Sequence, residues 1–241
     1  MVRLSQSRFL IALPLLILII IIVIPSSIAA APKTHVISFG KWTTVPWFPS
    51  IAAAHDKPLT LKVRPLLLDA HVKEFTLGPV HDVTDRLFVV RRAFRVNDNL
   101  PQESASPPHW QWQVGGWLLV DRTTGHIAPI NLPEFDVFYS EASWYRDYAA
   151  YCGVSDDGKK IYAIVAQLNR RKPVLKKLFD GQSIPENAAP DSACPTPAWQ
   201  RSPARVTFEP AAAPKQTFAI RGHTVDLVIE SEDPEDEGAS R

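Results

Sequence analysis

Apolar residues recur at every second position, or in short continuous runs, through most of this 241-residue chain. A period of two is the repeat of a β-strand, and the 3.6-residue repeat of an amphipathic helix is nearly absent. The pattern predicts an all-β fold: a single compact antiparallel β domain with propeller-like meanders, or alternatively a two-sheet β-sandwich. The expected strands are 34–42, 59–68, 87–96, 110–121, 148–152, 160–168, 174–179, 205–208, 216–220 and 224–229, and helical spacing is limited to 50–55 and 140–146.

The faces of these strands predict which of them are central. Residues 87–90 and 161–166 are apolar on both faces, so both segments should be covered on two sides, inside a sandwich or between stacked blades. Residues 59–64 alternate strictly between apolar and polar, which is typical of a strand with one wet face.

The first 29 residues predict an export signal. Arg3 and Arg8 precede the apolar stretch 9–24, and small residues follow it, with a cleavage site before Ala30. The alternative is an uncleaved membrane anchor, because sixteen residues fall just short of the roughly 17 to 25 that span a bilayer. In both cases the expected location is periplasmic or extracellular, either free or tethered through residues 9–24.

Two cysteines, Cys152 and Cys194, predict one disulfide in an exported chain. The bridge would hold the proline-rich loop 180–203, which has no hydrophobic period of its own. The β-rich domain is expected over 30–229. Residues 230–241 hold six acidic side chains and predict a disordered acidic tail. The formal net charge of +1 gives no reason to expect nucleic acid as a partner.

Two turn sequences within 75–179 carry a family resemblance. They are D-x-x-T-G at 121–125 and S-D-D-G-K at 155–159, each placed between expected strands. This arrangement resembles the blades of bacterial TolB-like and surface-repeat β-propellers, which implies four-stranded meanders of 40 to 50 residues. Residues 83–86 depart from the pattern, and the second unit lacks a clear fourth strand. The 200 residues from Ala30 to Ile229 hold four blades at most, so we expect propeller-like meanders and no complete propeller.

The common catalytic and cofactor motifs are absent from the sequence, so no catalytic residue and no cofactor is predicted. One cluster has metal-ligand chemistry: His71, His81, Asp82 and Asp85. The favoured interpretation is that His71 caps a turn after Asp69 while His81 and Asp82 lie in an exposed connection before a strand, so no metal site is predicted.

Aromatic residues are the stronger functional signal. The candidate ligand-binding residues are Trp110, Trp112, Trp117, Trp144 and Tyr145. Exposed, such side chains would bind a sugar ring or an extended peptide; buried, they are core. Trp110 and Trp112 share a strand face, and Trp117 lies on the other face unless the pair Gly115–Gly116 inserts a bulge.

Acidic and basic side chains indicate two further candidate functions. Glu134, Asp136, Glu141 and Asp147 stand among aromatic residues, as a glycoside hydrolase would require. The basic runs 91–95 and 170–177 indicate either a solvated face or a patch for an anionic polymer or lipid headgroup.

The hypothesis drawn from these observations is an exported, non-enzymatic, β-rich binding or scaffold protein of the cell envelope, with an unknown protein or carbohydrate ligand. The alternatives are a secreted hydrolase that uses the acids of 134–147 and an envelope assembly partner.

Overall fold

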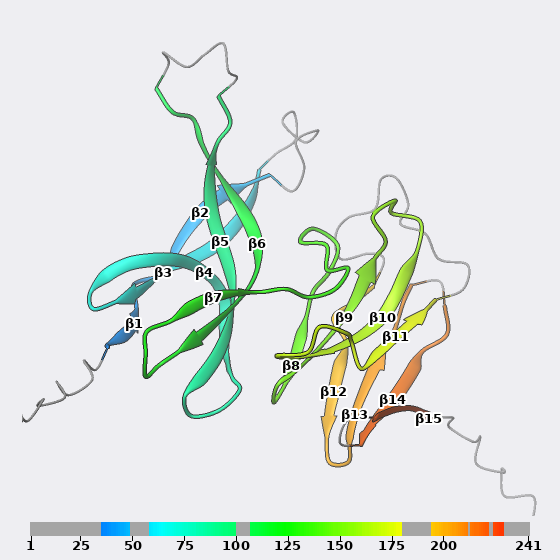
Figure 1. Cartoon of the computed structure of the whole chain (residues 1–241). Coiled ribbons are helices and arrows are strands. Elements are labelled where there is room, and N and C mark those ends of the chain that lie inside the picture. Colours follow the sequence, from blue (N-terminus) through cyan, green and yellow to red (C-terminus); the bar gives the residue numbers. More distant parts are fainter. Residues whose placement is uncertain are drawn as a thin grey trace, which may run out of the picture. The chain divides into compact units, whose positions relative to one another are not determined.

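The computed structural model describes residues 35–48, 58–99, 107–179, 194–211, 213–221 and 224–228 (Figure 1). These residues hold fifteen strands and no helix, so the all-β prediction is confirmed. Nearly all strand pairs are antiparallel, as expected. The predicted export signal 1–29, the helical stretch 50–55 and the acidic tail 230–241 lie outside the described residues.

The first sheet contains seven strands in the order β1-β3-β2-β6-β5-β4, with β7 paired to β6. An additional pairing of β3 with β4 closes β2, β3, β4, β5 and β6 into a ring. The one parallel contact, between β2 and β6 at Trp47 and Trp112, completes this ring. The strands are β1 (Ile37–Phe39), β2 (Thr43–Trp47), β3 (Leu59–Leu68), β4 (His71–Asp82), β5 (Leu87–Asn97), β6 (Trp110–Asp121) and β7 (Ile127–Ile130).

Each strand of the ring contributes apolar side chains to one shared core. The cluster contains Val63, Leu77, Ala93 and Val114, with Val45, Trp47, Leu61, Phe75 and Trp112 packed against it. Residues from all five strands meet only on the inner side of a closed sheet, so this cluster is the interior of the ring. Lys62, between Leu61 and Val63, is exposed, which agrees with the alternation expected for 59–64.

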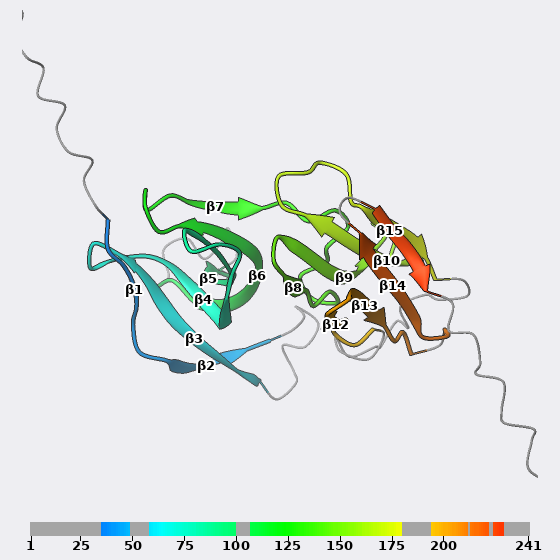
Figure 2. The same cartoon turned by 90° about the horizontal axis from the view of Figure 1, so that it is seen from below.

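The second and third sheets are four-stranded antiparallel meanders, in the orders β11-β10-β9-β8 and β12-β13-β14-β15 (Figure 2). Strands β4 to β7 follow one another in the same way within the first sheet. The likeness to propeller blades stays a prediction. The strands are β8 (Ser143–Tyr145), β9 (Tyr148–Val154), β10 (Ile161–Gln167), β11 (Leu175–Leu178), β12 (Ala198–Arg201), β13 (Ala204–Phe208), β14 (Gln216–Arg221) and β15 (Thr224–Val228).

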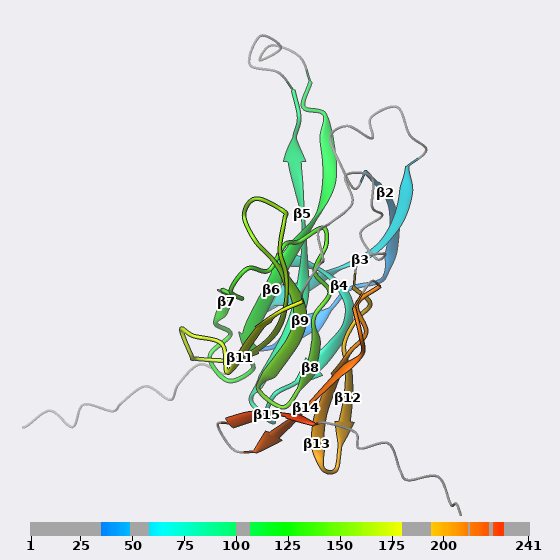
Figure 3. The same ribbon diagram turned by 90° about the vertical axis from the view of Figure 1, so that its right-hand side faces the viewer.

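Strands β9 and β10 are covered on both faces (Figure 3), and for β10 the apolar run 161–166 predicts this. On one face Tyr151 and Ile164 pack with Val89 and Trp117 of the first sheet. The opposite face belongs to a cluster with the third sheet, which holds Ala150, Cys152, Ala163, Val165, Val206, Phe208 and Phe218. The second sheet therefore lies between the other two.

Three sequence expectations were wrong. Residues 140–146 form a turn and the short strand β8 in place of a helix, because Trp144 pairs with Ala149 across a tight turn and packs against Trp117. Residues 180–193 of the expected loop 180–203 lie outside the described residues, and its described part contains strand β12, which is paired along its length with β13. The expected strand 34–42 is interrupted at residues 40–42, so β1 and β2 pair with different parts of β3.

The D-x-x-T-G turn forms as its sequence predicts. The Asp121 side chain accepts hydrogen bonds from the backbone N–H of Thr123 (2.8 Å) and Thr124 (3.3 Å). Gly125 adopts a φ of 68°, which favours glycine, and a Cβ there would meet Leu68 at 2.6 Å. The hydrogen bond from the Arg86 guanidinium lowers the pKa of Asp121 well below its usual range.

Cys152 and Cys194 form the predicted disulfide, with 6.2 Å between their Cα atoms. Both residues are buried, and the bridge joins β9 to the segment that leads into β12. A buried disulfide is compatible with an oxidising extracellular or periplasmic location.

Candidate ligand-binding site

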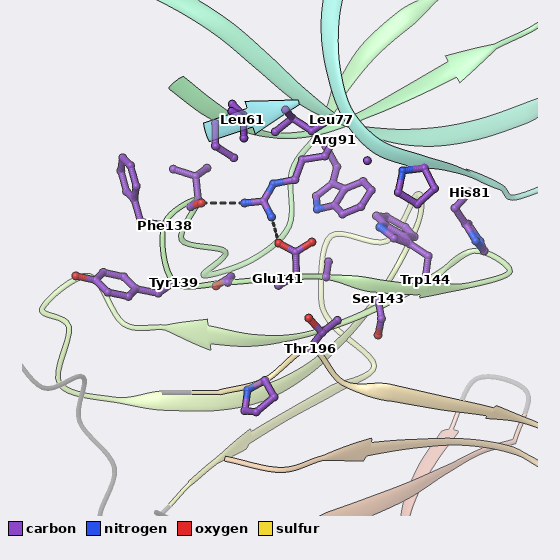
Figure 4. Close-up of a pocket in the computed structure, with 18 of the residues that line it drawn as sticks. Leu61, Leu77, His81, Arg91, Phe138, Tyr139, Glu141, Ser143, Trp144 and Thr196 are labelled. Atoms are coloured by element: carbon purple, nitrogen blue, oxygen red, sulfur yellow. Dashed lines mark hydrogen bonds and ion pairs between the residues drawn. The ribbon is translucent and has the colours of Figure 1, made fainter. Parts of the chain in front are cut away.

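A cavity of about 790 Å³ lies between the ring of the first sheet and the segment that leads into β8 (Figure 4). Strands β4, β5 and β6 supply one wall through side chains such as Leu77, His81 and Trp117. Residues 137–144 supply the facing wall, and residues 194–196 complete it. We call this space the central cavity.

Aromatic rings form one corner of the central cavity. The rings of Trp117 and Trp144 meet edge to face, with 5.3 Å between their centroids. His81 stacks on Trp144 at 6.2 Å, and its Nε2 atom donates a hydrogen bond to the carbonyl oxygen of Arg146 (2.9 Å). These contacts hold Trp144 between two elements, so the aromatic corner has a fixed geometry.

An ion pair between the buried Arg91 and the exposed Glu141 forms the polar corner. Arg91 is 8% exposed, and its guanidinium donates to the carbonyl oxygens of Val137 (2.8 Å) and Gly115 (3.3 Å) and to the Glu141 carboxylate. Figure 4 shows the guanidinium directed at the Glu141 carboxylate across the cavity. A buried charge is tolerated when it is paired and hydrogen-bonded, and Arg91 meets both conditions.

Four polar atoms of the cavity's lining residues are buried without a hydrogen-bond partner in the described part of the chain. They are the indole Nε1 atoms of Trp47, Trp117 and Trp144 and the Oγ atom of Ser143. These four atoms are covered by neighbouring protein atoms, so they lie behind the cavity surface and are not themselves contact points for a ligand.

The structure separates the five aromatic residues that the sequence indicated. Trp117 and Trp144 line the central cavity together. Trp112 packs edge to face on Phe75 at 5.0 Å, within the core of the ring. Trp110 is 55% exposed. Tyr145 packs on Trp199 at 5.4 Å, and its hydroxyl donates to the carbonyl oxygen of Arg201 (3.2 Å).

A bulge at the glycine pair sets the face that Trp117 occupies. Arg91 pairs with Trp117, and Ala93 pairs with Val114, so three steps along β6 match two steps along β5. Because Trp110, Trp112 and Trp117 pair with alternate residues of β5, they all lie on the same face. The alternative with a bulge is therefore the correct one.

The four candidate acids do not converge. Glu141 alone among them lines the central cavity, where it pairs with Arg91. The other acids have separate partners: Glu134 pairs with Lys176, Asp136 accepts from the backbone N–H groups of Phe138 and Tyr139, and Asp147 accepts from the Gln167 amide.

The candidate metal cluster does not assemble either. His71 and His81 lie near opposite ends of the twelve-residue strand β4, and Asp82 pairs with Arg122 (2.7 Å). Within the described ranges, no group of three or more histidine, cysteine or acidic side chains could hold a metal ion.

Sequence reasoning missed the roles of Arg91 and His81 in the cavity. Arg91 was assigned to a basic run, and its partner Glu141 lies 50 positions away. One local signal was present: Arg91 directly follows the apolar run 87–90 within the same strand, and a charge buried in such a strand requires a partner.

No family model matches the chain, and neither a curated protein nor a solved structure matches it at a significant level. The described residues include no helix that is long and apolar enough to span a membrane.

Proposed function

We propose that this chain is an exported, non-catalytic binding protein of the cell envelope and that the central cavity is its ligand site. The observation that carries the proposal is the cavity itself, with a volume of about 790 Å³, aromatic walls and one fixed ion pair. Ligand sites typically enclose roughly 300–1,000 Å³ and combine apolar walls with a few polar groups.

The aromatic corner favours a saccharide as the ligand. Trp117 and Trp144 offer apolar surface to the C–H face of a sugar ring. Arg91 and Glu141 supply a donor and an acceptor that are already oriented.

The partners of the four candidate acids support a binding function over glycoside hydrolysis. A glycoside hydrolase needs two carboxyl groups on either side of the scissile bond, about 5 to 9.5 Å apart. Here Glu141 is the one candidate acid at the cavity, and it is held by Arg91. The buried disulfide and the sequence of the first 29 residues support export.

The cavity can be tested with a probe and one blocking variant. Thr196 lies at its wall, so Thr196→Trp places an indole in the space while Thr196→Ala enlarges it. We expect Thr196→Trp to weaken the binding of 1-anilinonaphthalene-8-sulfonate at least about fivefold, measured by fluorescence titration, and we expect neutral oligosaccharides to displace this probe. Thr196→Ala is the matched control and should bind as the parent chain does.

Two results would contradict the proposal. The first is equal probe binding by the parent chain and Thr196→Trp. The second is turnover of nitrophenyl glycosides by the purified chain that Glu141→Gln abolishes, which would establish the hydrolase instead.

A further inference from the structure

A second hollow, of about 680 Å³, lies on the outer side of the ring. It is lined by Trp42, Thr44, Lys62, Arg64 and the segment 78–80, and we call it the Trp42 groove. Lys62 and Arg64 alternate along β3 with the inward-facing residues Leu61 and Val63, so their side chains leave the sheet on the outer face.

Arg64 contacts two aromatic rings, of which Trp42 lines the groove. Its guanidinium carbon lies 4.0 Å from the centroid of the Phe39 ring and 4.5 Å from that of Trp42. Two cation–π contacts restrain the guanidinium and leave its terminal N–H groups for hydrogen bonding.

The Arg64 charge has no carboxylate partner within the described part of the chain, and its Nε atom is buried without an acceptor. Desolvation by burial lowers the pKa of this guanidinium, as expected for a cation without a nearby anion. By contrast, Arg86, Arg91, Arg92 and Arg122 each pair with a carboxylate.

Three neighbouring side chains add to the binding chemistry of the groove. Lys62 is exposed and has no ion pair among the described residues. Trp42 is 48% exposed, so part of its indole is open to a ligand. Thr44 pairs directly opposite Lys62 and adds a hydroxyl on the same face. The groove thus combines two uncompensated cations with an exposed aromatic ring.

We propose that the Trp42 groove binds an acidic saccharide, a sugar ring that carries a carboxylate or a phosphate. The anionic group would accept hydrogen bonds from Arg64 and Lys62, and the sugar ring would pack on the exposed indole of Trp42. The groove and the central cavity share only the segment 78–80, so this proposal does not depend on the proposed function.

The test uses isothermal titration of the full chain with four probes. Trigalacturonate carries carboxylates, glucose 6-phosphate carries a phosphate, cellotriose is neutral and inorganic phosphate has no ring. We expect one of the two acidic sugars to bind at least about tenfold more tightly than cellotriose and inorganic phosphate. The acidic sugar that binds identifies the anionic group.

Two lysines provide a matched pair of variants. Lys62 lies in the groove, and Lys73 is an exposed lysine of the neighbouring strand β4 outside the groove. We expect Lys62→Gln to weaken the binding of the acidic sugar about fivefold or more, and Lys73→Gln to change it less than about twofold. Trp42→Ala should weaken it about tenfold, with circular dichroism to confirm that the variant is folded.

Four outcomes would overturn the proposal, three from the ligands and the matched lysines and one from the cavity variant. Neither acidic sugar binds, or inorganic phosphate binds as tightly as they do, or Lys73→Gln weakens binding as much as Lys62→Gln does. Loss of acidic-sugar binding in Thr196→Trp would place the ligand in the central cavity. That result would contradict a binding site in the Trp42 groove but would agree with the proposed function.

Discussion

At the scale of single residues, Arg91 shows how this fold tolerates a buried charge. Its guanidinium donates to two backbone carbonyl groups and one carboxylate, and these acceptors come from β6 and from the segment before β8. The side chain therefore connects two sheets that have no shared strand pairing. Glu141 differs, because 47% of its side chain is exposed and water can replace its partner.

This asymmetry predicts unequal costs for removing either partner. Arg91→Met leaves two carbonyl groups and a carboxylate without their donor, so we expect the free energy of unfolding to fall by about 2–4 kcal/mol. Glu141→Gln keeps an acceptor oxygen near Arg91, so we expect a loss of about 1 kcal/mol. Urea unfolding of the two variants measures both values, and a larger loss in Glu141→Gln would contradict the prediction.

At the scale of elements, the bulge in β6 decides which side chains enter the cores. The extra residue at Gly115–Gly116 keeps Trp112, Val114 and Trp117 on one face of β6, where Trp112 and Val114 pack in the ring interior and Trp117 packs against the second sheet. Without the extra residue, every side chain on one side of the pair would change face.

The bulge can be tested by comparing a substitution with a deletion. A Cβ at Gly116 would meet no atom within 4 Å, so Gly116→Ala should change the free energy of unfolding by less than about 0.5 kcal/mol. Deletion of Gly116 should turn Trp112 and Val114 away from the core and cost at least about 3 kcal/mol. Urea unfolding with near-ultraviolet circular dichroism compares the two, and a deletion variant as stable as Gly116→Ala would refute the register argument.

The sequence predicts elements when the signal is local. Strand β10 was predicted because its apolar run is continuous, and the turn at 121–125 because each residue type is dictated by a hydrogen bond or a positive φ. Strand β8 has three residues and follows no periodic pattern, so it could not be recognised. Strand β12 follows a proline-rich segment, which favours the prediction of a loop, so the strand was not indicated by the sequence.

Closure of the ring and assembly of the cavity depend on contacts between residues far apart in the chain, so neither could be predicted from the sequence. Closure of the ring depends on the contact between Trp47 and Trp112, which are far apart in the chain. The cavity depends on Arg91 meeting Glu141 and on Trp117 meeting Trp144. Residue types indicated that Trp117 and Trp144 were candidates, but no pattern in the sequence placed them together.

At the scale of the whole molecule, the disulfide ties the second sheet to the segment that enters the third. Cys152 lies in β9, whose seven residues are all buried, and Cys194 lies 42 positions further on. Residues 194–196 also border the central cavity, so the bridge fixes part of its wall.

Reduction should therefore loosen both the fold and the cavity wall. For a separation of 42 residues, loop closure contributes about 4 kcal/mol in the chain-entropy model. We expect mild reduction to lower the melting temperature and to increase proteolysis between residues 180 and 203, read by calorimetry and by mass spectrometry of limited digests. A Cys152→Ala/Cys194→Ala double variant is the control, since reductant should not change it further. Equal digestion of the parent chain with and without reductant would speak against this role.

The segment Gly78–Val80 has a consequence for how this protein can diverge. Pairing between β4 and β5 skips these residues, and they border both the central cavity and the Trp42 groove. A single change at Val80 therefore reshapes two recesses at once. If both recesses bind ligands as proposed, a substitution within residues 78–80 would alter both sites together, whereas a substitution at Lys62 or at Thr196 would alter one of them alone.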